Sequence, residues 1–300
     1  MTLAQFWFIL ITLLWTGFFV LEGFDLGVGM LHGIVGRDEA GRRTVINTIG
    51  PLWDGLLTGG SLLVPLLAGM ALGDLLAGLP IDKSQNYTGT FWDLFQPYGV
   101  YTGITLVAIC VLHGATFITL KTTGDVADRA ARVAARSGPA VAPIVIGWAV
   151  WTHITAGKGF WPNPVEIGIV IVVVAAAWLA HDRQGGWAFT CSTITIALAM
   201  LTLFTDLYPN VMISSTNSAY NLTIANTASP SYTLHLMSIV AIVFLPVVLV
   251  YTAWNYYVFR KRISSSDFAP PRLPGVRPSS DGPAQPPSGP AKPPGVRETT

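Results

Sequence analysis

Two carboxylates stand inside the first long apolar segment, where an ionisable side chain is costly. Glu22 and Asp25 follow 21 residues that contain no Asp, Glu, Lys or Arg. They are three residues apart, so they lie about one helical turn from each other and share a face. Gly23, Gly27 and Gly29 give a smooth surface that another helix can approach closely. The pattern indicates a hydrated proton relay, with simple interfacial charges in the headgroup zone as the alternative.

A third candidate for the same path is Asp54, in the block Pro51-Leu52-Trp53-Asp54-Gly55. It lies where the next apolar segment begins, so it can either join the proton path or cap the N-terminus of the following helix. Two other acidic residues, Asp74 and Glu166, fall near the predicted outer ends of spans. We expect these two to be interfacial charges.

The histidines and cysteines do not form a recognisable cofactor or metal site. No two of the five histidines have ligand spacing on one helix; they are His32, His113, His153, His181 and His235. A lone membrane histidine is more often a hydrogen-bonded packing residue, so haem ligation by this chain is not expected. The two cysteines lie in apolar runs without a paired motif, which argues against a disulfide framework or a metal centre. With no nucleophile constellation and no phosphate-binding glycine loop, we predict no catalytic, cofactor-binding or metal-ligating residue.

The elements that must position these residues are membrane-spanning helices. Of 300 residues 51% are hydrophobic and 11% are charged, whereas a soluble domain carries roughly 25% charged residues. A hydrocarbon core of about 30 Å needs roughly 20 apolar residues in a helix. Seven segments qualify: 5–31, 56–79, 98–120, 139–154, 165–180, 187–207 and 234–258. Their continuous apolar character favours helices over barrel strands, so the sequence predicts an all-α polytopic membrane protein.

Lys and Arg residues predict the orientation of these spans, because cytoplasmic loops carry an excess of both. The connections on the opposite side hold only Lys83 and Lys158. The segments that follow odd-numbered spans hold eleven basic residues before the tail: Arg37, Arg42, Arg43, Lys121, Arg129, Arg132, Arg136, Arg183, Arg260, Lys261 and Arg262. We therefore predict an external N-terminus and a cytoplasmic C-terminus. The net charge of +1 gives no reason to expect a nucleic-acid partner.

Three polar segments remain outside the predicted spans. Residues 123–137 have the pattern of a short amphipathic cytoplasmic helix. Residues 209–232 are rich in Asn, Ser and Thr, and they form either a cap on the outer face or a solvated loop. From residue 264 to 300 the chain is dense in Pro, Gly and Ser, which predicts a disordered cytoplasmic tail after a transmembrane domain of residues 1–263.

An ordered set of motifs resembles subunit II of cytochrome bd-type quinol oxidases. The first is EGFDLGVGM at 22–30, similar to the first-helix motif of that family, and NTIGPLWDG at 47–55 follows in the expected order. Further similar blocks lie at 78–82, 87–90, 112–115, 120–122, 186–189, 208–209, 231–234 and 254–260. The resemblance extends from about residue 5 to residue 263.

This resemblance implies a multi-pass subunit of a respiratory oxidase in the bacterial plasma membrane. Such an oxidase takes electrons from a quinol, reduces O2 to water and draws protons from the cytoplasm. The resemblance places haem b, haem d and the quinol site in subunit I, with which this chain would pair. It also implies that the residues matching the family's acidic positions, Asp25 and Asp54, belong to a hydrated proton path. Small accessory subunits, membrane lipid and quinone are further possible partners.

Two other functional classes stay open from the residues themselves. In a proton- or ion-coupled secondary transporter, Glu22 and Asp25 would bind the coupling ion, although no inverted repeat is visible. In a purely structural membrane scaffold, no acidic side chain would affect turnover. Co-purification with a haem-bearing partner distinguishes an oxidase subunit from a transporter. Acid-to-amide variants distinguish a proton path from a purely structural scaffold.

The sequence departs from the family pattern directly after Trp53-Asp54-Gly55. In the family, Trp-Asp-Gly is followed by Asn-Glu-Val-Trp and a long hydrophobic stretch, whereas Gly55 here runs into Leu56-Leu57-Thr58. We predict that about two spans are missing from the N-terminal half, relative to eight or nine in the family. Loss of an even number preserves the downstream orientation. It also leaves open which of two Trp-Asp sites of the family Asp54 matches.

Overall fold

Seven long helices account for the predicted spans. The computed structural model describes residues 1–49, 57–157, 159–258, 261–264 and 267. Within these ranges seven helices are long and apolar enough to cross a membrane, which confirms the all-α polytopic fold. They are α1 (Leu3–Val35), α3 (Leu57–Ala77), α4 (Pro97–Lys121), α5 (Asp125–Ala156), α6 (Pro164–His181), α7 (Gly185–Leu207) and α9 (Ser231–Val258). The shorter elements are α2 (Glu39–Ile46), η1 (Phe91–Leu94), β1 (Asn210–Met212), η2 (Ser218–Tyr220), β2 (Leu222–Thr223) and α8 (Ile224–Thr227). Of the predicted tail at 264–300, residues 265–266 and 268–300 lie outside the described residues.

The fourth span is longer than predicted. The prediction of a separate amphipathic helix at 123–137 is wrong, because α5 continues without interruption from Asp125 through Pro139 and Pro143 to Ala156. Proline removes one backbone hydrogen bond and usually ends a helix, but neighbouring helices make it tolerable in membrane proteins. Asp125 and Asp128 lie in the first turn of α5, where negative charge is favourable near the helix N-terminus.

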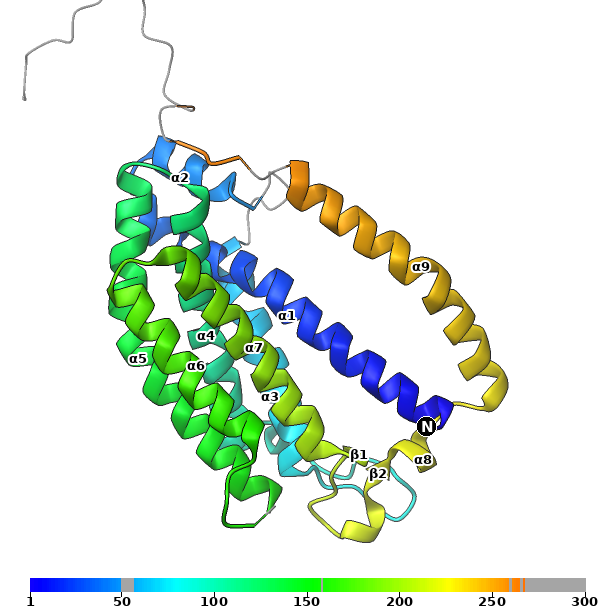
Figure 1. Cartoon of the computed structure of the whole chain (residues 1–300). Helices are drawn as coiled ribbons and strands as arrows, with labels where there is room; N and C mark the ends of the chain where they lie inside the picture. Colours follow the sequence, from blue (N-terminus) through cyan, green and yellow to red (C-terminus); the bar gives the residue numbers. More distant parts are fainter. Residues whose placement is uncertain (50–56, 158, 259–260, 265–266, 268–300) are drawn as a thin grey trace, which may run out of the picture. The chain divides into compact units, whose positions relative to one another are not determined.

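Close helix crossings hold the packed helices together. Helix α4 contacts α1, α3, α5 and α7, and α6 packs between α5 and α7, as Figure 1 shows. Glycines lie at the closest crossings: a Cβ atom on Gly27 of α1 would come 2.7 Å from the Cα atom of Gly114 in α4. Gly69 of α3 and Gly103 of α4 meet in the same way. Small residues at such positions let membrane helices approach backbone to backbone.

The polar segment at 209–232 is a folded cap and not a solvated loop. Strands β1 and β2 pair antiparallel, with Asn210 opposite Thr223. The cap is hydrogen-bonded to the end of α3 and to the chain after it, through Ile213 N to the Leu75 carbonyl (3.0 Å) and Ser215 N to the Leu79 carbonyl (3.0 Å). These bonds fix the loop that follows α3, next to the N-terminal end of α1 (Figure 1).

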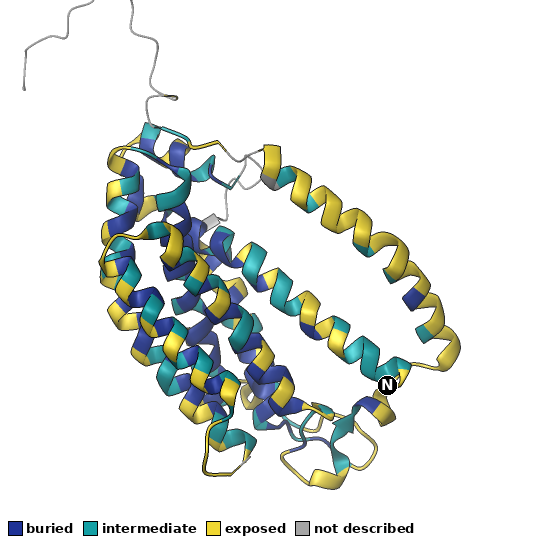
Figure 2. Ribbon diagram, in the orientation of Figure 1, coloured by how far each residue is buried: buried dark blue, intermediate teal, exposed yellow. Residues whose placement is uncertain are grey.

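Helix α9 is attached to the other helices at its two ends. Near its start, Trp7 Nε1 of α1 donates to Ser238 Oγ at 3.0 Å. Beyond its end, Ile263 N donates to the Lys121 carbonyl at 2.8 Å and Arg262 Nε donates to the Leu120 carbonyl at 2.8 Å. Ser238 is nevertheless the one buried residue among the described side chains of α9, and Figure 2 shows the helix almost wholly exposed.

Orientation in the membrane stays a prediction that topology reporters can test. A reporter fused after Arg262 is expected to be cytoplasmic, and one inserted in the cap within 210–231 is expected to be external, because basic residues cluster at the Arg262 side. Paired alkaline phosphatase and fluorescent-protein fusions measure both positions. The opposite assignment at either position would contradict the orientation.

Candidate functional site

The two candidate carboxylates of α1 have different surroundings, although they lie one turn apart. Asp25 is half-buried, and its Oδ1 atom is fully buried without a hydrogen-bond partner among the described residues. Glu22 is exposed on the surface of the chain. A buried carboxylate oxygen without a donor is costly when ionised. The geometry therefore suits a group that exchanges a proton with water or with a neighbouring side chain.

An aromatic cluster next to Asp25 fixes this part of α1. Phe24 stacks on Phe117 of α4 with ring centroids 4.0 Å apart. His113 stacks on Phe189 of α7 at 4.5 Å, with an interplanar angle of 6°. Its Nδ1 atom lies 2.7 Å from Ser192 Oγ and its Nε2 atom lies 3.3 Å from the Val20 carbonyl. His113 is thus a hydrogen-bonded packing residue, as the sequence predicted.

The crossing of Gly27 and Gly114 sets the position of Asp25 relative to α4. Gly27 is two residues after Asp25, and its backbone lies so close to the backbone of α4 that a Cβ atom would not fit between them. Because the two backbones touch here, the crossing fixes the position of Asp25 next to α4. The third candidate, Asp54, lies in the segment 50–56, outside the described residues.

Asp74 is buried, so the prediction of an interfacial charge is wrong. Its relative exposure is 3%, and its Oδ1 atom occupies the space where a Cβ atom of Gly99 in α4 would be. That oxygen has no hydrogen-bond partner among the described residues. Sequence position alone could not show this, because the burial depends on the close approach of α3 to α4. Asp206 in α7 is also buried, at 6% exposure, and the sequence analysis missed it.

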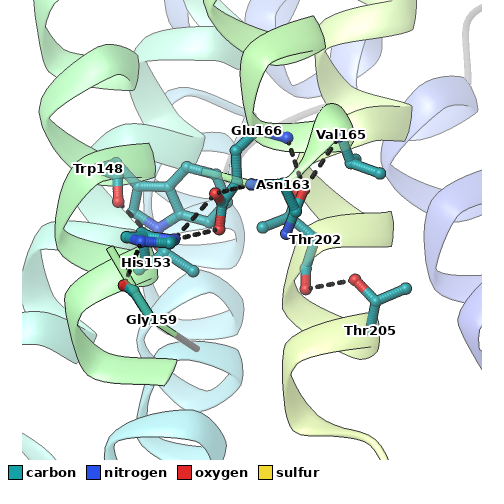
Figure 3. Close-up of polar contacts among 9 residues, drawn as sticks. Trp148, His153, Gly159, Asn163, Val165, Glu166, Thr202 and Thr205 are labelled. Carbon is teal, nitrogen blue, oxygen red and sulfur yellow. Dashed lines mark hydrogen bonds and ion pairs between the residues drawn. The ribbon is translucent and has the colours of Figure 1, made fainter. Parts of the chain in front are cut away.

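Glu166 is buried as well, in a polar cluster that closes the connection between α5 and α6 (Figure 3). Its Oε2 atom lies 3.0 Å from His153 Nδ1 and accepts a hydrogen bond of 2.8 Å from Asn163 N. Asn163 Oδ1 in turn accepts from Val165 N and Glu166 N, both at 2.9 Å. His153 Nε2 lies 3.0 Å from the Gly159 carbonyl. Glu166 is therefore part of a helix cap and not an interfacial charge.

Loss of this carboxylate is expected to destabilise the protein. Glu166→Ala leaves Asn163 N and His153 without their acceptor, which costs about 1–3 kcal/mol and lowers the melting temperature of the detergent-solubilised protein. Glu39→Ala is the matched control, because its ion pair with Arg43 (2.9 Å) is exposed and is worth about 0–1 kcal/mol. Equal melting temperatures for the two variants would contradict a stabilising role for the cluster.

The loop before α4 presents exposed aromatic rings. Phe91 and Trp92 are 65% and 75% exposed, as suits residues that anchor helices at a membrane interface. Asp93 Oδ2 accepts from Thr90 N at 2.6 Å and from the Thr90 hydroxyl at 2.9 Å. These hydrogen bonds to the ionised form lower the pKa of the Asp93 carboxyl. The residues that the structure describes contain no group of three His, Cys, Asp or Glu arranged for a metal ion.

Known proteins similar to this chain share one description. A profile of the family "Cytochrome bd terminal oxidase subunit II" matches residues 3–58 and 54–259. Cytochrome bd ubiquinol oxidase subunit 2 of Bacillus subtilis is 33% identical, over 89% of this chain and 98% of the relative. Cytochrome bd-I ubiquinol oxidase subunit 2 of Escherichia coli K12 is 28% identical, over 87% of this chain and 95% of the relative.

The same comparisons locate the departure that the sequence indicated. The two matched parts of the family profile meet at residues 54–58, at the Trp53-Asp54-Gly55 block. The alignment to the B. subtilis protein has 332 positions but holds 89% of the 300 residues of this chain, so about 65 positions carry residues of the relative alone. Roughly 20 residues cross a bilayer once, so the difference has the size of the two missing spans that we predicted.

Proposed function

The chain belongs to the family of cytochrome bd terminal oxidase subunit II, and from this membership we propose that Asp25 relays protons for the oxidase. The chain is accordingly a subunit of a quinol-oxidising oxidoreductase complex and a multi-pass protein of the bacterial plasma membrane. Membership does not favour an ion-coupled transporter. If the chain is only a scaffold, substitution of Asp25 leaves turnover of the complex unchanged, whereas a proton relay requires the Asp25 carboxyl.

One observation supports the relay more than any other. Asp25 places in a membrane helix a buried carboxylate oxygen that has no partner among the described residues, and such intramembrane carboxylates mark proton or ion paths. A neutral carboxyl donates a proton and the carboxylate accepts one, so the group can pass protons one at a time. Glu22 lies one turn before Asp25 in α1 and its side chain is exposed, so a chain covering that face can receive the proton. Asp54 remains the third candidate of the path.

Haem b and haem d, in our proposal, are held by the partner, subunit I. The complex contains haems as a cytochrome bd oxidase, but the histidines of this chain fit axial ligation poorly. Both ring nitrogens of His113 face hydrogen-bond partners, and both of His153 face oxygen atoms. The chain's own contribution is then to pack against subunit I and to hold Asp25 in place. A membrane quinol serves the complex as the electron donor and leaves it as the quinone.

Affinity purification of this chain from its own membranes tests the proposal. The purified complex is expected to contain a second membrane polypeptide and to show a reduced-minus-oxidised haem spectrum. The chain expressed without its partner is expected to carry no haem, since His113 and His153 already have other partners. Stoichiometric haem on the isolated chain would contradict the assignment of both haems to subunit I.

A further inference from the structure

One face of α1 is apolar, exposed and interrupted by a carboxylate. Residues Trp7, Ile11, Trp15, Phe18 and Glu22 follow a spacing of three and four, so they share one side of the helix. Ile11 is 42% exposed and Phe18 is 40% exposed, and Glu22 is exposed as well. An uncovered carboxylate at this depth would face lipid, which is costly.

Helix α3 continues this surface. A groove of about 450 Å³ runs between α1, α3 and the first turns of α9, lined among others by Trp7, Trp15, Ala68, Ala71 and Met237. One turn before Ala68 on the same side of α3, Val64 is 43% exposed, and a Cβ atom on Gly60 would meet no atom within 4 Å. We call Ile11, Trp15, Phe18, Glu22, Gly60 and Val64 the open face.

Helix α9 does not cover the open face. It is attached near its start through Ser238 and beyond its end through Arg262 and Ile263. Between these attachments Val243, Val247 and Val250 are 56–70% exposed. Attachment at both ends with no packing between them leaves the middle of the open face free for another occupant.

The comparisons indicate the size of that occupant. The B. subtilis relative carries about 65 positions that have no counterpart here, and the family match is broken at residues 54–58, directly before the open-face helix α3. Such a length supplies two spans of roughly 20 residues. We infer that the open face docks a pair of membrane-spanning helices from a separate polypeptide, which replaces the segment that the relatives carry within their own chain.

The chemistry of the open face favours a protein over lipid acyl chains. Glu22 requires a hydrogen-bond donor, which a polar side chain of a docked helix supplies and an acyl chain does not. Gly60 permits the close backbone approach that helices in this fold achieve at Gly27 and Gly114. The partner is therefore a short two-span chain with a donor side chain at the depth of Glu22.

Site-specific photo-crosslinking in membranes that contain the whole complex tests this inference. A photoreactive residue at Phe18 is expected to give an adduct with a polypeptide that spans the membrane twice, several times more than at Trp178. Trp178, on α6, is the matched control because it is an aromatic residue and is 63% exposed. Adducts of Phe18 with lipid alone, with α9 of the same chain or with the haem-bearing subunit would each overturn the inference.

A second measurement uses a defined partner. A two-span segment drawn from the residues of the B. subtilis relative that have no counterpart in this chain is co-expressed, as a separate polypeptide, with the tagged full chain. It is expected to co-purify with the wild type and to be lost several-fold with Glu22→Leu, whereas Trp178→Leu retains it. If Phe18 crosslinks to a two-span chain but the Glu22→Leu variant still retains the added segment, the inferred hydrogen-bond donor to Glu22 is wrong. If neither the adduct nor the co-purification is observed, the inference that the open face docks a helix pair is overturned.

Discussion

Asp25→Asn is expected to slow quinol-driven O2 reduction by about 100-fold, the lower range for loss of a positioned acid–base group. The haem spectrum of the assembled complex is expected to stay unchanged, because the amide has the shape of the carboxyl and because our proposal assigns both haems to subunit I. The physical reason is that an amide cannot take up and release a proton between its two states. Oxygen consumption by the purified complex with a reduced quinol, followed across the pH range, measures the effect.

Asp74→Asn is the matched control for this variant. Asp74 is also a membrane carboxylate with a buried oxygen atom that lacks a partner among the described residues, but it lies in α3 near the cap, away from the predicted proton-uptake side. The turnover of the Asp74→Asn complex is expected to stay within about twofold of the wild type, because removing a carboxyl slows proton transfer only if that carboxyl lies on the proton path. Asp25→Glu, which keeps the carboxyl, is expected to restore part of the rate.

Unchanged turnover of an assembled Asp25→Asn complex at every pH would return Asp25 to a simple interfacial charge. The scaffold interpretation would then hold for this chain. Equal losses for Asp25→Asn and Asp74→Asn would instead indicate that any buried carboxyl is needed for folding. The intact haem spectrum separates that outcome from a blocked proton path, since a misassembled complex loses its haems.

The sequence predicted the spans well because their signal is local. An apolar run of sufficient length has few alternatives to a membrane helix, and the short connection between α6 and α7 falls between the predicted spans 165–180 and 187–207. The error at α5 arose because Pro139 and Pro143 resemble a helix start. Within the protein they are interior residues of one continuous helix. Contacts with neighbouring helices stabilise that continuous helix, and the local sequence does not reveal those contacts.

The burial of polar residues could not be predicted from the sequence. Asp74 and Glu166 both lie near helix ends, yet Asp74 is covered by the crossing at Gly99 and Glu166 by His153, 13 residues away in the chain. For the candidate site, the types and spacing of Glu22 and Asp25 were informative. Their different exposure follows from the crossing of α1 with α4, which brings Gly27 to Gly114 across 87 residues.

That crossing leads to the second large effect. Gly27→Leu is expected to reduce the yield of assembled complex to less than about a tenth of the wild type. A Cβ atom at residue 27 would come 2.7 Å from Gly114 Cα and 2.8 Å from Gly114 N, and both are backbone atoms of α4 that cannot rotate away. Overpacking of this kind costs about 1–3 kcal/mol, sometimes more, where about 1.4 kcal/mol already corresponds to a tenfold change in an equilibrium.

Gly17→Leu is the matched control on the same helix, because a Cβ atom at Gly17 would meet no atom within 4 Å. Its complex is expected to form at close to the wild-type yield, measured by gel filtration after detergent extraction and by melting temperature. Gly27→Ala, which adds a single methyl group, is expected to fall between the two. Normal assembly of Gly27→Leu would show that α1 can move away from α4 at little cost. In that case the crossing could not hold Asp25 next to α4, and the relay would need another positioning contact.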